Sequence, residues 1–318
     1  MRTSAKIIIT GAGSIVIQFG LAIAGWGGWS AFFSHPALQA LAWVAAALSL
    51  LAVFSGTGMS SGEKEDRANR WVLGAFGAIA LLMAYFDAAN TISSDQEHQK
   101  ALTELLHQPG LQPATLAEIA KSAQRISSAD EKAKVLSELV ALDIQDSTVH
   151  RAFFDAVNSI SSDEDHARVL SSLGGKAGLT SGTLEEILES ASRVSSDEEK
   201  PNVVVEMRKI DLRDEGVQSA FFKAADSISS DDEHGRVLTT VLKRHDLSAK
   251  VVNAAIESAT HISSDDVKAQ VLTQVVDAYC GDTLVRAHLR SAVESLESNA
   301  QYRKLMSELA KQEASQKQ

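Results

Sequence analysis

The sequence predicts an all-α protein in which three transmembrane helices are followed by an α-solenoid of helix-turn-helix repeats. Three observations support this prediction. A motif of eleven residues starts every 34 residues, apolar side chains recur within each copy at helical spacing, and residues 7–62 contain no Asp, Glu, Lys or Arg. We therefore divide the chain into a membrane domain, residues 1–91, and a repeat domain, residues 92–318.

The membrane domain is predicted from its long uncharged stretch. A spanning helix needs about 20 apolar residues, so the stretch accommodates spans at about 7–29 and 37–55, and a further apolar run predicts a span at about 71–88. Lys and Arg precede the first span and lie between the second and third, which places the N-terminus in the cytoplasm. The predicted location is thus the bacterial cytoplasmic membrane, as a multi-pass protein with its repeats on the extracytoplasmic side.

The repeat domain is built on copies of the sequence ISSD. They start at residues 92, 126, 160, 194, 228 and 262, with a degenerate copy at 296. Leu or Val stands ten residues after each start, and a second apolar stripe follows, as at Phe153, Phe154 and Val157. Two amphipathic stripes separated by loop residues indicate a pair of helices in each repeat, and stacked helix pairs form a HEAT-like α-solenoid.

The motif also predicts how the first helix of each repeat begins. Ser followed by Glu three residues later forms a capping box, in which the Ser oxygen accepts from a free backbone N–H of the first turn. The predicted pairs are Ser94 with Glu97, Ser128 with Glu131, Ser196 with Glu199, and Ser230 with Glu233. Phosphorylation of these serines and calcium binding by the acids are alternatives. The first competes with the cap, and the second lacks the glycine-turned loop that calcium sites use.

A 68-residue super-repeat is superimposed on the 34-residue period. The sixth residue after each start alternates between His and Lys, which gives the row His98, Lys132, His166, Lys200, His234 and Lys268. We expect this row to lie on the surface of the solenoid, either as a stripe that contacts a partner or as a solvated face. The three histidines are too far apart to share a metal ion, because two repeats separate each from the next.

No catalytic, cofactor-binding or metal site is predicted. Cys280 is the only cysteine, which excludes an intrachain disulfide, and no Cys/His cluster has metal-ligand spacing. Gly11 and Gly13 lack the third glycine of a dinucleotide-binding loop. Residues 92–318 hold 25 Lys and Arg against 37 Asp and Glu, which argues against nucleic acid and favours a basic segment in a protein or peptide partner. The lipid bilayer is the other expected partner.

Parts of the sequence resemble known families. The segments FGLAIAGWGGWSAFFSHPAL (19–38), LAVFSG (51–56) and EDRANRWVLGAF (65–76) resemble the N-terminal third of bacterial isoprenylcysteine carboxyl methyltransferase-like membrane proteins. The Arg-His-Pro motif of that family's S-adenosylmethionine site has no counterpart here, so the resemblance implies a shared membrane module without its chemistry. The ISSD repeats resemble arrays attached to BlaR-type membrane-bound regulatory peptidases, whose zinc motif His-Glu-x-x-His is also missing.

The expected function is therefore that of a non-catalytic, membrane-anchored scaffold, since α-solenoids present extended surfaces to proteins and peptides. The alternative is a membrane enzyme or enzyme subunit derived from the methyltransferase family and acting on a lipid-like substrate.

Overall fold

The computed structural model describes residues 84–142, 144–207, 210–244, 246–279 and 281–315, and all regular elements in these ranges are helices. The chain divides into two compact units, residues 1–127 and 128–318, which are described separately. In the first unit, helical residues 84–89 are followed by α5 (Asp95–Leu106) and α6 (Pro113–Ala123).

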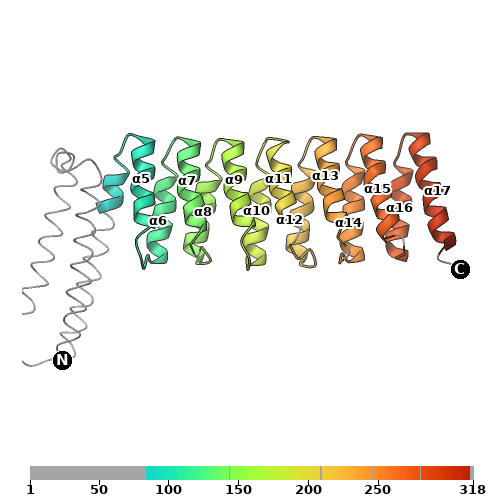
Figure 1. Cartoon of the computed structure of the whole chain (residues 1–318), viewed down its shortest axis with the longest axis horizontal. Coiled ribbons are helices and arrows are strands. Elements are labelled where there is room, and N and C mark those ends of the chain that lie inside the picture. The colour runs from blue at the N-terminus through green and yellow to red at the C-terminus, as the bar shows by residue number, and fades with distance from the viewer. Residues whose placement is uncertain (1–83, 143, 208–209, 245, 280, 316–318) are drawn as a thin grey trace, which may run out of the picture. The chain divides into compact units, whose positions relative to one another are not determined.

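The second unit is a row of helix pairs (Figure 1). The first helices of the pairs are α7 (Ala129–Val140), α9 (Asp163–Gly174), α11 (Glu199–Glu206), α13 (Asp231–Leu242), α15 (Asp265–Tyr279) and α17 (Asn299–Ser315). The second helices are α8 (Ser147–Val157), α10 (Ser181–Ala191), α12 (Glu215–Asp226), α14 (Ala249–Thr260) and α16 (Thr283–Glu294). This arrangement is the one that an α-solenoid requires.

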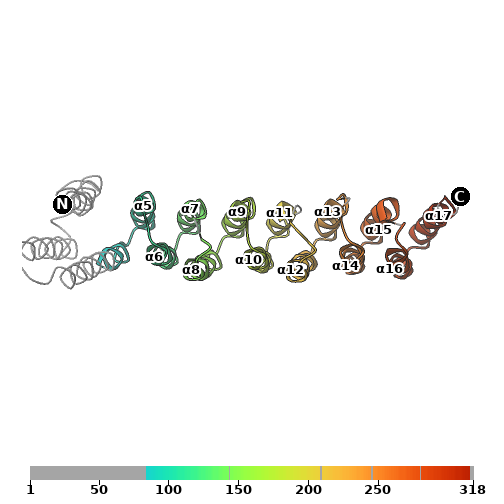
Figure 2. The ribbon, with the colours of Figure 1, turned by 90° about the horizontal axis from the view of Figure 1, so that it is seen from below.

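The helix pairs of the second unit form two layers, as Figure 2 shows: the odd-numbered helices lie in one layer and the even-numbered helices in the other. Within each layer a helix packs against the equivalent helix of the next repeat, for example α7 against α9 and α10 against α12. The core lies between the layers. Its recurring member is the apolar residue ten positions into each repeat, and Leu136, Leu170, Val204, Leu238 and Leu272 are all fully buried. Each such burial contributes about 1.5–3 kcal/mol.

The predicted transmembrane helices require correction. None of the helices between residues 84 and 315 is long and apolar enough to cross a membrane. This finding contradicts the three-span fold class and the multi-pass membrane location. Residues 84–88, the end of the third predicted span, pack on a repeat instead: Phe86 is buried, and the Tyr85 hydroxyl donates to the Ala101 carbonyl at 2.7 Å. Residues 7–29, 37–55 and 71–83 of the predicted spans lie outside the described residues.

Serine side chains cap the first helices α5, α7, α9 and α13. The Oγ atoms of Ser94, Ser128 and Ser230 each accept from the backbone N–H three residues on, at 3.4 Å, and those donors belong to Glu97, Glu131 and Glu233. Ser196 accepts from the backbone N–H groups of Glu198 and Glu199, both at 3.2 Å, but it precedes the N-cap of α11, which is Glu198. A cap of this kind contributes about 1 kcal/mol.

The Asp of the motif joins one repeat to the next. Asp163 Oδ1 accepts from the backbone N–H of Ser195 at 3.1 Å, and Asp197 Oδ1 accepts from that of Ser229 at 2.9 Å. Asp231 accepts twice, from Ser263 N–H at 3.0 Å and from Ser264 N–H at 2.8 Å. In the first unit Asp95 makes the same bond to Ser127 N–H at 3.1 Å. The residue that lies at the positive end of its own helix therefore also holds the turn that starts the following repeat.

Basic side chains join the repeats of the second unit at the opposite edge. Lys176 Nζ donates to the Leu142 carbonyl at 3.1 Å and also to that of Val140, at the end of α7. Arg244, 68 residues on, donates to the Ile210 carbonyl at 2.7 Å. Lys176 therefore lies at the negative end of α7, where positive charge is favourable, and Arg244 binds the turn that follows α11.

We predict that replacing Asp231 with Ala lowers the free energy of unfolding by about 1.5–3 kcal/mol, because two backbone N–H groups lose a charged acceptor. Urea unfolding followed by circular dichroism measures the change. Asp232→Ala is the matched control, since it removes the same charge from the same turn at an exposed side chain; it costs about 0.3–1 kcal/mol through the helix dipole alone. Equal losses for the two variants would show that the inter-repeat bonds do not stabilise the array.

Candidate functional site

The alternating row of His and Lys lies in the interior, which contradicts its predicted place on the surface. His98, Lys132, His166, Lys200, His234 and Lys268 are only 3–7% exposed. They cannot form a partner-facing stripe or a solvated face. Their positions in the first turn of each odd-numbered helix point them between the layers, and buried polar groups there need partners.

Each histidine of the row belongs to a buried cluster. His166 Nε2 lies 2.8 Å from Ser190 Oγ, and Ser190 Oγ donates to Asn158 Oδ1 at 2.7 Å. Since the serine proton is given to the amide oxygen, the imidazole Nε2 carries a proton and donates to the serine. In the first unit the same bonds join His98 to Ser122 and Ser122 to Asn90, at 2.9 and 2.8 Å.

The third cluster contains a carboxylate in place of the amide. His234 Nε2 lies 2.8 Å from Ser258 Oγ, which donates to Asp226 Oδ1 at 2.5 Å. The same carboxylate oxygen is 3.4 Å from His234 Nε2 and 3.4 Å from His261 Nδ1. Burial alone would raise the pKa of Asp226, but the hydrogen bonds from His234, Ser258 and His261 outweigh it and leave the pKa below its usual value.

Lys132 and Lys200 of the row bind helix ends, and Lys268 Nζ lies 3.9 Å from a carboxylate oxygen of Asp265. Lys132 Nζ donates to the carbonyl and the hydroxyl of Ser159, both at 3.0 Å, and Lys200 Nζ donates to the Ser227 carbonyl at 2.7 Å. Lys132 and Lys200 therefore each bind the C-terminal end of the second helix of their own repeat, where the helix dipole favours a cation. The 68-residue period thus has a physical basis, since one repeat of each pair uses a histidine cluster and the other a buried lysine.

The Ser, His and Asp of the third cluster do not form a hydrolytic triad. In a triad the imidazole accepts the serine proton through one nitrogen while the acid binds the other nitrogen. Here Ser258 gives its proton to Asp226, and one nitrogen of His234 faces both groups. Ser258 is also 1% exposed, so no substrate can reach it. The cluster stabilises the packing of helices rather than activating a nucleophile.

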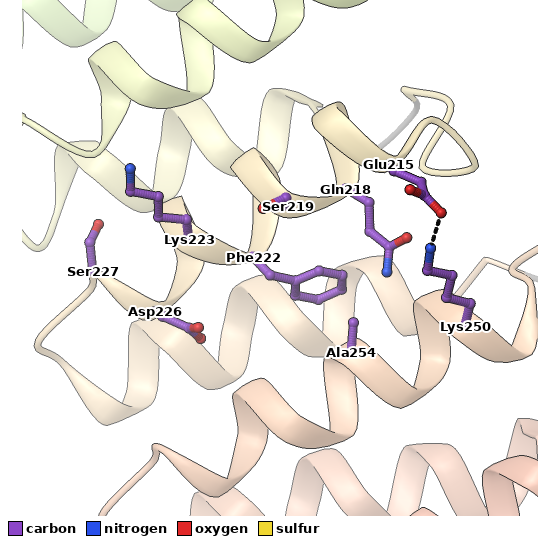
Figure 3. Close-up of a pocket in the computed structure, with 9 residues that line it drawn as sticks. All are labelled: Glu215, Gln218, Ser219, Phe222, Lys223, Asp226, Ser227, Lys250 and Ala254. Carbon is purple, nitrogen blue, oxygen red and sulfur yellow. Dashed lines mark hydrogen bonds and ion pairs between the residues drawn. The ribbon is translucent and has the colours of Figure 1, made fainter.

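A groove lies open to solvent between α12 and α14, with a volume of about 820 Å³. Figure 3 shows the ring of Phe222 between the two helices, beside Ala254. An ion pair between Glu215 and Lys250 bridges the helices near one end. At the other end Lys223, Asp226 and Ser227 line the groove. Its lining therefore combines a small exposed part of the largely buried Phe222 with charged side chains of both signs.

The groove is open because a small residue stands at position 254. Glu186, 68 residues earlier, occupies the equivalent place on α10, and its carboxylate lies 3.0 Å from His150 Nδ1 on the neighbouring α8. Ala254 has no side chain that could form such a pair, and both Phe222 and Phe154 are largely buried, at 7% and 5% exposed. Sequence reasoning missed this site, although the loss of Glu at an equivalent position of the repeat was a readable signal.

Metal binding finds no support in the described part of the chain, where no group of three or more His, Cys, Asp or Glu is arranged to hold a metal ion. The capping serines are engaged by backbone N–H groups, as described above. Cys280 lies outside the described residues.

Comparisons with known proteins add little. No protein-family model and no curated protein matches the chain. One similar solved structure, described as "Computational Design of Self-Assembling Cyclic Protein Homooligomers", is 11% identical, covers 87% of this chain and 93% of that chain, and has a TM-score of 0.17. A similarity of this size carries no argument about fold or function.

We predict that the buried histidines make the protein less stable in mild acid. Burial is the largest cause that lowers the pKa of His166; nearby Asp163 opposes it and Arg193 adds to it. The unfolded chain binds the proton near pH 6.5, so the stabilisation is present above about pH 6.5 and is lost as the pH falls towards the lowered pKa of the folded state. The slope for one such group is at most about 1.4 kcal/mol per pH unit.

Urea unfolding at about pH 7.5 and about pH 5.5 measures this effect. His166→Gln should lose less stability than the wild type between the two values, whatever its absolute stability. His288→Gln, which removes an exposed imidazole by the same substitution, is the control. A wild-type slope in the His166→Gln variant would contradict the buried neutral imidazole.

Proposed function

We propose that the chain is a non-catalytic helical-repeat scaffold that binds a segment of a partner protein in the α12–α14 groove. The observation that carries the proposal is the groove itself, an open space of about 820 Å³ lined by apolar and charged side chains, because concave sites that combine the two are the usual binding sites for a partner segment. The methyltransferase-derived alternative depends on a membrane module and is not carried forward.

The chemistry of the groove and of the array favours a partner segment that combines apolar and basic side chains. Phe222 and Ala254 offer the apolar contact, and charges of both signs lie at both ends of the groove, so the preference for a basic segment rests on the overall charge of the array. Residues 92–318 hold 12 more acidic than basic residues, from 37 against 25, so a basic segment approaches a surface of opposite overall charge. Helix pairs joined at both edges keep such a groove preformed, which reduces the entropic cost of binding.

A photo-cross-linking residue at Ser219, an exposed position that lines the groove, tests the proposal in cells that make the full chain. The same residue at Gln270, which is exposed on α15 in the other layer, is the control. We expect a partner cross-linked from position 219 and absent from position 270. Equal labelling from both positions, or from neither, would contradict groove binding.

Binding measurements with the purified partner then test the groove itself. Ala254→Glu places in the groove the side chain that the equivalent position already has, and should weaken binding by about tenfold or more, equivalent to about 1.4 kcal/mol. Gln270→Glu adds the same charge on the other layer and should bind like the wild type. If Ala254→Glu also binds like the wild type, the groove is not the site.

A further inference from the structure

One buried polar side chain of the α12–α14 groove makes no hydrogen bond with any residue that the structure describes. It is the carboxamide of Gln218, a residue of α12 that is only 7% exposed. Gln218 lines the groove, and Figure 3 shows its side chain pointing from α12 towards α14. Because buried side-chain amides normally have their hydrogen bonds satisfied, such a group in the wall of a groove points to a ligand.

The equivalent residue 68 positions earlier, on α8, faces two polar side chains. His150 Nε2 lies 3.2 Å from Thr183 Oγ1, and His150 Nδ1 lies 3.0 Å from Glu186 Oε2. In the α12–α14 pair the positions of these two neighbours hold Val251 and Ala254, and neither can form a hydrogen bond through its side chain. Helix α12 thus has a polar side chain at a position whose two equivalent neighbours within the fold are apolar.

The chemistry of the carboxamide specifies what can bind it. Its oxygen accepts hydrogen bonds and its NH₂ group donates them, side by side. Every residue of an extended peptide other than proline offers the complementary pair, its own backbone N–H and C=O. In a helix these backbone groups are bonded to one another, so a bound helix would leave the carboxamide without a partner. An apolar side chain placed over it would displace water without replacing the hydrogen bonds, which costs affinity.

We propose that Gln218 binds the peptide backbone of the partner segment, and that this segment enters the α12–α14 groove in an extended conformation. The inference rests on the function proposed above and specifies the conformation of the partner. In an extended segment successive side chains point to opposite sides, so every second one faces the groove, where Phe222 and Ala254 offer apolar contacts. Gln218 therefore selects for the conformation of the segment, while the rest of the groove selects for its side chains.

The first test asks, without any partner, whether the Gln218 carboxamide serves the fold. Gln218→Met keeps the length of the side chain and removes the amide, so it should leave the urea midpoint of the full-length protein unchanged or raise it. His150→Met removes the polar side chain that faces Thr183 and Glu186 at the equivalent position, and it should lower the midpoint. Equal lowering by the two variants would show that the carboxamide is already paired inside the protein, and would overturn the proposal.

The second test measures backbone recognition with peptides. A library of short random linear peptides is selected on the full-length protein, and peptides that Ala254→Glu binds about tenfold more weakly are kept as groove ligands. Gln218→Met should also weaken these peptides by about tenfold, whereas Gln270→Met, the same substitution at an exposed position of the other layer, should bind them like the wild type. Backbone N–H groups of one peptide are then replaced singly by N-methyl groups. One such replacement should weaken binding to the wild type and have little further effect on Gln218→Met.

The outcomes separate this inference from the function on which it rests. If groove-binding peptides bind Gln218→Met as they bind the wild type, or if every N-methyl group has the same effect on both proteins, the carboxamide does not bind the backbone. The inference then fails and the groove function stands. If the library yields no peptide that binds through the groove, the groove function fails and the inference fails with it.

Discussion

Most neighbouring repeats are joined by a hydrogen bond from the backbone of one ISSD turn to the Asp of the preceding turn, whereas the second copy has Ala129 in place of this Asp. This Asp lies in the first turn of its own helix, where the dipole stabilises its charge, and it accepts from the N–H of a serine 32 residues on. In a solenoid each repeat contacts only its neighbours, so stability is a sum of repeats and the interfaces between them. A motif that caps a helix and bonds to the next repeat stabilises both the single repeat and the interface between repeats. This explains why its residues recur in most copies.

The buried clusters add specificity to this stacking. A polar side chain in the interior is tolerated only when its hydrogen bonds are satisfied. Ser190 and Ser258 serve the histidines, and the equivalent position of the alternate repeats is Ala224, where a lysine binds a helix end instead. The groove and the third histidine cluster, which contains Asp226, are the exceptions to this regularity. Ala254, Asp226 and His261 differ from the residues 68 positions earlier in the super-repeat, and they lie on or next to α12 and α14. The groove of the proposed function lies between the same two helices.

Much of the repeat architecture is predictable from sequence, because capping, helical periodicity and a fixed period are local signals. Pairing Ser94 with Glu97 and its equivalents requires no knowledge of the fold. The row that contains His166 and Lys200 was placed wrongly on the surface, since polar residues in a first helical turn are usually solvated. The alternation of Ser190 with Ala224 was the signal that these residues are buried with partners. The groove could not be predicted, because it depends on which side chain bridges two helices. The membrane spans were inferred from apolarity alone, and the described residue Tyr85 bonds to a repeat instead.

Native-state hydrogen exchange at the amides of Ser263 and Ser264 tests most directly whether the Asp–turn bond holds the array together. These amides lie in a turn outside any helix, and their acceptor is the carboxylate of Asp231. If the repeats are joined as described, both amides should be protected to the same degree as those of the helices α13 and α15, because they open only when the neighbouring repeats separate. Exchange at the rate of an open turn, with α13 and α15 still protected, would contradict the central role of this bond.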